Sequence, residues 1–353
     1  MIASFISLSS AVVYLTPFIG KTIDRLHRNY AETPTAIQIR AAVNKAMPRL
    51  WEGMEQHNQK RSCFTCHNHG VSLVALATAK SHGFDVSNER IKEQIDYITD
   101  EYDGYRERFK KGQGPGPSPT GGATDNTGYA LLALKAVGYR PNDLTELVVS
   151  YTLSYQADRS HWTTNARRMP TEASAFTSTA LNIAAISHFA TDLQRLQARE
   201  RIAAARSWLL IAKPNDTEDR VFRLLGLKFA NADEAAIREA VRDLSLTQRD
   251  DGGWAQTDDL DSDAYATGSA LYALRTAGKV ATSDLRWRRG LEWLVTRQRD
   301  DGTWHVISRS KPIQKYFESG FPHEKDQFIS CSASAWSTAA LALATPPSKY
   351  LAK

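Results

Sequence analysis

The sequence predicts an all-α protein built as an array of helical hairpins. Two kinds of predicted helix alternate along the chain. One kind is short, rich in alanine and leucine and apolar over most of its circumference, which is typical of inner helices. The other kind is longer and more charged and is expected on the outside. The inner helices that start at Thr127, Thr177 and Thr267 are separated by 50 and 90 residues, so one degenerate repeat is expected between the last two.

The hydrophobic periodicity gives the order of the elements. Inner helices are expected at 127–134, 177–184, 267–274 and 337–343, with the degenerate one near 221–227. Outer helices are expected at 143–155, 194–211, 234–247 and 284–297. Three helices precede them, at 35–60, at 71–80 and after the N-cap Ser87. The stretch 112–126 is rich in glycine and proline and is predicted to be a loop.

A short turn motif ties the hairpins together. Three outer helices end in a glutamine that is followed six residues later by a tryptophan: Gln156 and Trp162, Gln248 and Trp254, Gln298 and Trp304. In the last two, Arg-Asp-Asp-Gly lies between them, and glycine after aspartate permits a tight turn. We expect the glutamine amide to bond the backbone of the next repeat and the tryptophan to pack beneath the next helix.

Composition excludes several classes of protein. The chain has 353 residues, 42% of them hydrophobic, and a net charge of +5 with a pI near 9.0. Its basic residues form short clusters without interleaved aromatic residues, so no nucleic-acid partner is expected, although the charge would suit an anionic ligand or membrane surface. Three cysteines are too few for a disulfide scaffold, and Cys331 is expected to be a buried small residue.

The N-terminal residues 1–30 resemble a signal or anchor segment. The first twenty residues are apolar and uncharged, and Lys21, Arg25 and Arg28 follow. This pattern predicts export, with the protein periplasmic or anchored to a membrane and facing away from the cytoplasm. The alternative is a buried or loosely docked terminal helix. Residues 31–353 are expected to form a single domain.

Alternating inner and outer helices tied by Q-x-x-D-G-x-W turns resemble the terpenoid cyclase and protein prenyltransferase superfamily. The resemblance covers roughly residues 35–344 and implies one α/α toroid, like half of a squalene cyclase. It also implies an inner ring around an apolar cavity for a hydrophobic, isoprenoid-type ligand. The residues expected at such a cavity are Tyr129, Tyr265, Tyr272, Trp336 and, from the 305–330 insert, His323.

The resemblance suggests one catalytic candidate. Class II cyclases protonate an alkene with the middle aspartate of D-x-D-D, and Asp261 and Asp263 match that pattern, but Ala264 replaces its last aspartate. Asp263 is therefore a candidate general acid, and the alternative is a carboxylate that caps the following helix. A zinc prenyltransferase does not fit, because Asp263 occupies the position of its zinc cysteine and no histidine begins the final inner helix.

The strongest chemical motif lies elsewhere. Cys63-Phe-Thr-Cys66-His67 matches the C-x-x-C-H sequence that attaches c-type haem: the thiols form thioethers and the histidine binds the iron. The alternatives are a metal site completed by His69, a redox disulfide, and a structural disulfide or free thiols. A sixth iron ligand, where present, would come from the residues His69, His57, Met54 and Met47.

Three functions remain open at this stage. The first is an exported toroid with a hydrophobic ligand cavity, a c-type haem and a redox partner. The second is a class II terpene cyclase that uses Asp263. The third is a non-catalytic binding scaffold, because a fold does not determine function.

Overall fold

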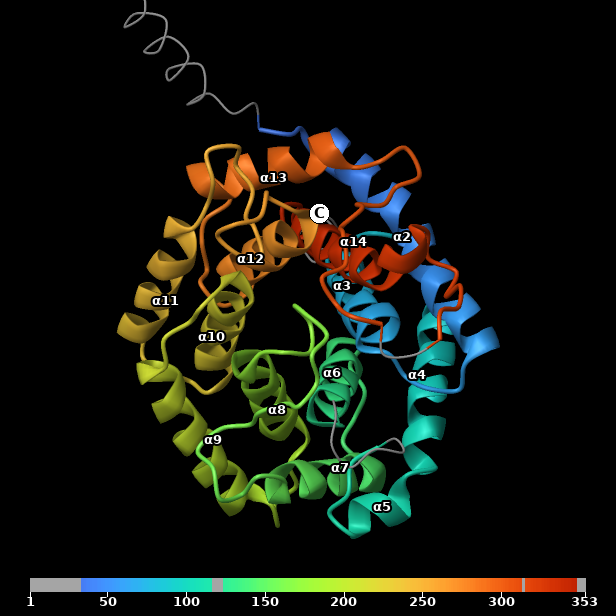
Figure 1. Ribbon diagram of the computed structural model, residues 1–353, viewed down its shortest axis with the longest axis vertical. Coiled ribbons are helices and arrows are strands. Elements are labelled where there is room, and N and C mark those ends of the chain that lie inside the picture. The colour runs from blue at the N-terminus through green and yellow to red at the C-terminus, as the bar shows by residue number, and fades with distance from the viewer. Residues whose placement is uncertain (1–32, 116–122, 313–314, 348–353) are drawn as a thin grey trace, which may run out of the picture.

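The inner ring of the molecule is a closed circle of helices. The computed structural model describes residues 33–115, 123–312 and 315–347, so the predicted signal or anchor segment lies outside the described residues. The inner helices contact one another in sequence, and the last contacts the first (Figure 1). They are α3 (Val71–Ser81), α6 (Ala123–Ala136), α8 (Ala175–Phe189), α10 (Thr217–Phe229), α12 (Ala264–Thr276) and α14 (Gln327–Ala342).

A second ring of helices surrounds the first (Figure 1). It consists of α2 (Ala36–Lys60), α4 (Asn88–Asp103), α5 (Arg106–Lys110), α7 (Asp143–Ser154), α9 (Arg195–Ile211), α11 (Glu234–Leu246) and α13 (Leu285–Arg297). The predicted all-α toroid is confirmed, and the described residues include only two isolated β-bridges. Among these described helices, none combines the length and apolar character that a bilayer crossing requires.

Burial explains which helices lie inside. In α8 almost every side chain is buried, including polar Asn182 and Thr179. In α11 the buried residues are Ile237, Ala240 and Leu244, a spacing that gives the helix one apolar face. The distinction between inner and outer helices therefore follows from the circumference over which each sequence is apolar.

All inner helices from α6 onward begin earlier than predicted, and α6 and α14 show the reason. The helix expected from Thr127 starts at Ala123, inside the predicted loop, and the Thr127 hydroxyl donates to the Ala123 carbonyl at 3.0 Å. The helix expected from Ser337 starts at Gln327. Its first turns are rich in serine, and Ser330 is nevertheless buried because its hydroxyl accepts the Val306 N–H at 3.0 Å. Hydrophobic periodicity does not detect either helix start, because the first turns carry polar side chains. The fold buries these side chains together with hydrogen-bond partners.

The glutamines of the turn motif join neighbouring repeats. Gln248 Nε2 donates to the carbonyl of Gly252 in its own turn and to that of Arg286 in α13, both at 2.8 Å. Gln298 Nε2 donates likewise to Gly302 at 3.0 Å and to Ala42 in α2 at 2.8 Å. Because α2 is the first described helix of the outer ring, the Gln298 bond closes the circle. These two turns confirm the predicted role of the glutamine.

The Gln156 turn differs, since it has no glycine. Its amide bonds Thr163 within the same turn: Nε2 donates to the Thr163 hydroxyl at 2.9 Å and Oε1 accepts the Thr163 N–H at 2.8 Å. The tryptophans behave alike in all three turns. Each is buried, and its indole N–H donates to a carbonyl near the end of the preceding outer helix, at 2.8 to 3.0 Å. The tryptophan therefore holds each turn against the helix before it.

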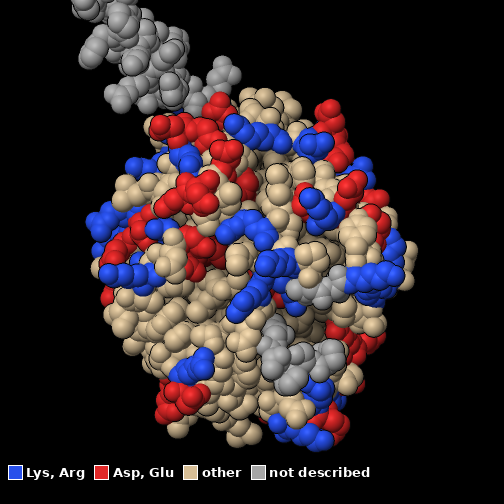
Figure 2. All heavy atoms as spheres, in the orientation of Figure 1, with Lys and Arg blue, Asp and Glu red and all other residues tan. Residues whose placement is uncertain are grey.

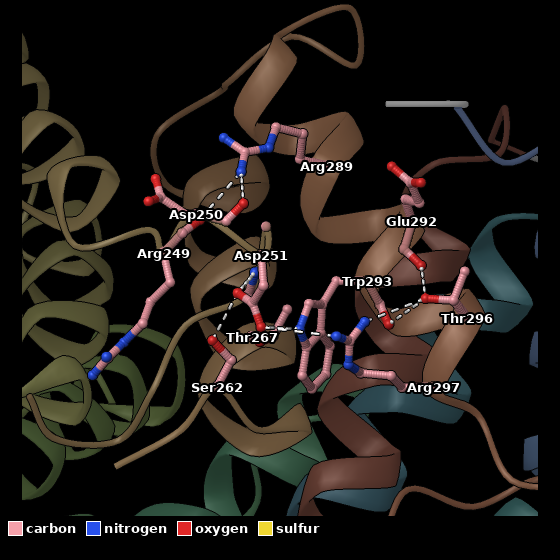
Figure 3. A network of polar contacts seen from close by, with 12 residues as sticks. Arg249, Asp250, Asp251, Ser262, Thr267, Arg289, Glu292, Trp293, Thr296 and Arg297 are labelled. Carbon is pink, nitrogen blue, oxygen red and sulfur yellow. Dashed lines mark hydrogen bonds and ion pairs between the residues drawn. The ribbon is translucent and has the colours of Figure 1, made fainter. Parts of the chain in front are cut away.

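Asp251 organises the second turn (Figure 3). Its carboxylate accepts the N–H of Gly253 at 3.0 Å, the Ser262 hydroxyl at 2.9 Å and the Trp293 indole at 2.8 Å. Burial acts to raise the pKa of Asp251, but these hydrogen bonds outweigh it and leave the pKa below its usual value. The Asp-Asp-Gly sequence thus links a turn, the start of α12 and the outer helix α13.

Candidate functional site

A cavity of about 800 Å³ opens at the toroid, within the size range of small-molecule sites. Its walls include the segment 61–67, the turn 168–172, residues 308–312 and 315–317, and the start of α14. Cys63, Cys66 and His67 all line it. The structure therefore places the three residues of the C-x-x-C-H motif on one cavity.

Local hydrogen bonds hold the motif in place. Cys66–Gly70 forms a single π-helical turn, η1, and the Thr65 hydroxyl accepts the Asn68 N–H at 2.9 Å. Asn68 Nδ2 donates to the Gly53 carbonyl in α2 at 2.8 Å. A Cβ at Gly70 would lie 3.1 Å from Tyr129 Cβ, so glycine lets η1 approach α6 closely. The motif is thus fixed between an outer and an inner helix.

The imidazole of His67 lines the cavity, with both ring nitrogens free of hydrogen bonds within the described residues. Its Nδ1 lies 3.9 Å from Glu172 Oε1. Burial, followed by the charge of Arg168, lowers the pKa of His67 to about 3. The imidazole is therefore neutral at physiological pH, with a lone pair free to bind a metal ion.

Both motif thiols are free and protonated. Cys63 is exposed and Cys66 is buried, and neither forms a disulfide. Burial, then the charge of Glu101, raises the pKa of Cys63. Burial, then the charge of Glu172, raises the pKa of Cys66 well above its usual value. A thiol that stays neutral is a poor candidate for a reactive thiolate, but it remains available to form a thioether.

The residues predicted as additional ligands differ in whether they line the cavity and have a free ligand atom. His69 is buried, its Nδ1 accepts the Thr65 N–H at 3.2 Å, and its Nε2 lies 2.6 Å from Asn58 Oδ1, so both nitrogens are occupied. Met47 and Met54 are buried in the core. His57 does line the cavity, its Nδ1 has no partner, and burial followed by Arg61 lowers its pKa to about 4. In the described ranges no group of three or more His, Cys, Asp and Glu could hold a bare metal ion.

The rest of the cavity lining combines apolar side chains, basic side chains and the carboxyl groups of Glu101, Glu172 and Asp326. Its apolar side chains include Phe64, Met169, Phe317, Phe328 and Ile329. Its cations are Arg61, Arg168, Lys311, Lys315 and Lys325. Lys and Arg side chains gather over the middle of the face viewed along the toroid axis (Figure 2). This arrangement suits a flat or elongated apolar molecule that carries acidic groups.

Asp261 and Asp263 lie away from this cavity. Asp261 is exposed. Asp263 is the N-cap of α12, and its Oδ1 accepts the N–H groups of Tyr265 at 2.9 Å and Ala266 at 3.0 Å. Burial raises the pKa of Asp263 to about 6. The geometry is that of a helix cap, and neither aspartate is among the residues that line the cavity.

The side chains expected at an apolar cavity are used in packing instead. Tyr129, Tyr265 and Trp336 are buried within the core. Tyr272 packs on Trp336 with ring centroids 4.9 Å apart. His323 begins the short helix η2 (Glu324–Asp326), where its Nε2 lies 2.7 Å from the Thr303 hydroxyl. None of the five is among the residues lining the described cavity.

Sequence reasoning missed a buried acidic cluster beside the motif. Glu172 pairs with Arg168 at 2.7 Å. Asp125 accepts the Ser178 hydroxyl, and burial followed by the charge of Glu172 raises its pKa to about 7. Asp125 lay in the predicted loop, and Glu172 lies in an irregular segment without periodicity. The one available signal was that Asp125 is the next-to-last residue of the glycine- and proline-rich stretch 112–126, directly before an alanine- and leucine-rich helix.

Comparison with known proteins supports the architecture. Residues 220–329 match the squalene-hopene cyclase C-terminal domain. Over 120 residues the chain is 33% identical to lanosterol synthase of Aspergillus fumigatus, which covers 33% of this chain and 15% of that enzyme. The chain therefore matches a small part of the curated relative's length.

Solved structures resemble the chain over most of its length. Type II terpene cyclase MstE from Scytonema superposes with a TM-score of 0.55 at 14% identity, over 88% of this chain and 98% of that chain. A variant of MstE was solved in complex with its substrate, geranylgeranyl dihydroxybenzoate. A possible member of the GH105 family from Salmonella enterica has a TM-score of 0.50 at 13% identity, over 88% of this chain and 94% of that chain.

These likenesses establish the fold alone, because a fold does not determine function. The chain is a terpenoid-cyclase-like α/α toroid with a squalene-hopene cyclase C-terminal domain match at 220–329.

Proposed function

We propose that this protein is a c-type haem protein built on a terpenoid-cyclase-like toroid. The observation that carries the proposal is that Cys63, Cys66 and His67 line one cavity of about 800 Å³. Both thiols and the imidazole therefore lie beside one partly apolar space that is large enough for a ligand.

The chemistry of the cavity fits haem in each of its parts. The free thiols would form the two thioethers, and the neutral imidazole of His67 would bind the iron. Phe64, Phe317 and Phe328 would cover the porphyrin faces. Basic side chains of the cavity lining would pair with the propionates. Bound there, haem would supply one-electron chemistry, while the protein sets its ligand, its solvent exposure and its acidic surroundings.

The proposal carries expectations about location and partners. Covalent haem attachment takes place outside the cytoplasm, which agrees with an export role for residues 1–30. We therefore propose an exported, periplasmic protein, or one held at the membrane through that segment. Its partner would be a redox protein that reaches the cavity edge.

Spectroscopy of the full chain tests the proposal directly. The protein would be expressed with its own N-terminal segment in a bacterial host that has a haem c maturation system. The reduced pyridine spectrum should show a c-type haem, and the intact mass should include it. C63A and C66A should each lose a thioether, whereas C331A, which removes a buried thiol outside the cavity, should retain both. Wild-type protein without covalent haem would refute the proposal.

A hydrophobic isoprenoid-type ligand is the second candidate, because the MstE fold holds a geranylgeranyl compound with an acidic head. Apolar and basic side chains in the cavity lining would suit an isoprenoid acid in this chain also. A class II cyclase reaction would then require an acid, and the sequence proposes Asp263. Asp263 does not line this cavity, so the reacting alkene would have to lie at the start of α12 instead. Incubation with geranylgeranyl substrates and analysis of the products tests this, since turnover that survives D263N would exclude Asp263 as the acid.

A further inference from the structure

A buried ion pair lies next to the proposed iron ligand. Glu172 is 1% exposed, and its Oε2 lies 2.7 Å from Arg168 Nη1. The two residues also form an antiparallel bridge, in which Glu172 N–H donates to the Arg168 carbonyl at 2.9 Å. The second carboxylate oxygen, Oε1, is buried without a hydrogen bond. The neighbouring Cys66 thiol is the group that can donate to Glu172. A bound state that consumes the thiol proton would leave the buried carboxylate in need of another donor, because an unpaired buried oxygen is costly.

That oxygen faces His67. Glu172 Oε1 lies 3.9 Å from His67 Nδ1, roughly 1 Å beyond hydrogen-bond distance. A small movement of either side chain completes the contact. The nitrogen turned toward Glu172 is Nδ1, which leaves Nε2 as the nitrogen available to a metal. Hydrogen bonds to one ring nitrogen fix which nitrogen can bind the metal.

We propose that Glu172 is a positioning residue that accepts the Nδ1–H of His67 and so forms a carboxylate–histidine–iron arrangement. This inference rests on the proposed haem function and deepens it. Arg168 holds Glu172 in place from the other side through the 2.7 Å contact. The neighbouring Cys66 has a thiol proton, which thioether formation would remove, so attachment would leave His67 as the donor next to Glu172.

The contact has a measurable consequence for the iron. A carboxylate that shares the Nδ1 proton raises the electron density of the imidazole and makes it a stronger ligand. A stronger, more negative ligand stabilises ferric over ferrous iron and lowers the reduction potential. We therefore expect a haem of low potential for a histidine-ligated site.

The test compares E172Q with the wild type, both as full-length haem-loaded proteins. E172Q keeps the size of the side chain and removes its charge. We expect covalent haem in both proteins. In E172Q the equilibrium constant for ferric over ferrous iron should fall at least tenfold, which raises the reduction potential by about 59 mV. The iron–histidine stretching band of the ferrous protein should move to lower frequency. E172D, which retains the charge, should bring the potential back toward that of the wild type, and it serves as the second variant if E172Q folds poorly.

E101Q is the matched control. Glu101 also lines the cavity, but its carboxylate accepts the Phe64 N–H. Among the described residues no hydrogen bond or ion pair joins it to His67. A potential shift in E172Q no larger than that in E101Q would overturn the inference while the haem proposal stands. Wild-type protein without covalent haem would overturn the haem proposal, and with it this inference.

Discussion

Removing the arginine of the buried pair should destabilise the protein in a pH-dependent way. In R168Q the Glu172 carboxylate loses its 2.7 Å partner while its side chain stays 2% exposed. Breaking a fully buried pair costs about 3–5 kcal/mol, but Arg168 is 34% exposed, so water screens part of the interaction. We expect R168Q to lower the free energy of unfolding by roughly 2 kcal/mol at pH 8.

The sign of the pH dependence follows from Glu172. Burial raises the pKa of Glu172, and the charge of Arg168 opposes that rise. A carboxyl with a raised folded pKa contributes stability that is fully present below its unfolded pKa, about 4.3, and is lost as the pH rises through its folded pKa. Without Arg168 the folded pKa rises further. The difference between R168Q and wild type should therefore be small near pH 4.5 and largest at pH 8.

Urea denaturation at several pH values measures this effect. R167Q is the matched control, because Arg167 is the adjacent, exposed arginine. The double variant R168Q/E172Q should regain most of the lost stability, since it removes the unpaired charge. Equal stability of R168Q and R167Q, or a loss of the same size at pH 4.5 and pH 8, would refute the view that this pair neutralises a buried charge.

Three further outcomes are expected. D125N should stabilise the protein at pH 9 relative to pH 5 in urea titrations, because burial raises the pKa of Asp125 to about 7 and ionisation therefore costs the wild type up to roughly 4 kcal/mol. G302A should lower the melting temperature far more than G138A: both glycines have positive φ, but a Cβ at Gly302 would lie 2.2 Å from the Lys45 carbonyl, whereas Gly138 faces open space. G302A should lower the free energy of unfolding by at least about 2 kcal/mol. In haem-loaded protein H57A should change the ferric absorption spectrum if His57 binds the iron, and an unchanged spectrum would exclude it.

The fold could be predicted because its signals are local and repeated. Gln248 and Trp254 lie six residues apart, and they bond their own turn, Leu244 in the preceding helix α11 and Arg286 in the next outer helix α13. The same sequence pattern at Gln298 gives the same geometry and closes the ring on α2. Periodicity likewise located the inner and outer helices, and it failed where helix starts carry buried polar residues, as at Asp125.

The candidate site could be predicted only in part. Cys63, Cys66 and His67 are adjacent in sequence, so their motif was visible. Glu172 is more than a hundred residues away from them, and no spacing rule connects an irregular turn to a cysteine motif. The predicted cavity residues Tyr129 and Tyr265 came from the fold resemblance, which does not specify which side chains fill the axis.

The position of the site has a structural cause. Hydrogen bonds join the first turns of neighbouring inner helices: Thr177 in α8 donates to Glu218 in α10 at 2.8 Å, and Tyr265 in α12 donates to the same carboxylate at 3.0 Å. The starts of these helices therefore lie at one end of the toroid. Unpaired backbone N–H groups and positive dipole ends collect there and favour carboxylates, such as the Asp263 cap.

The C-x-x-C-H motif lies at the same end of its own inner helix, because η1 leads directly into α3. The hairpin repeat thus brings the starts of the inner helices to one end of the toroid. The residues at each start determine which functional groups lie there. In this chain the start of α12 carries a capping aspartate, whereas the start of α3 carries two thiols and a free imidazole. The proposed haem site therefore lies at the start of α3, although the turn motif that is typical of the fold lies before α12.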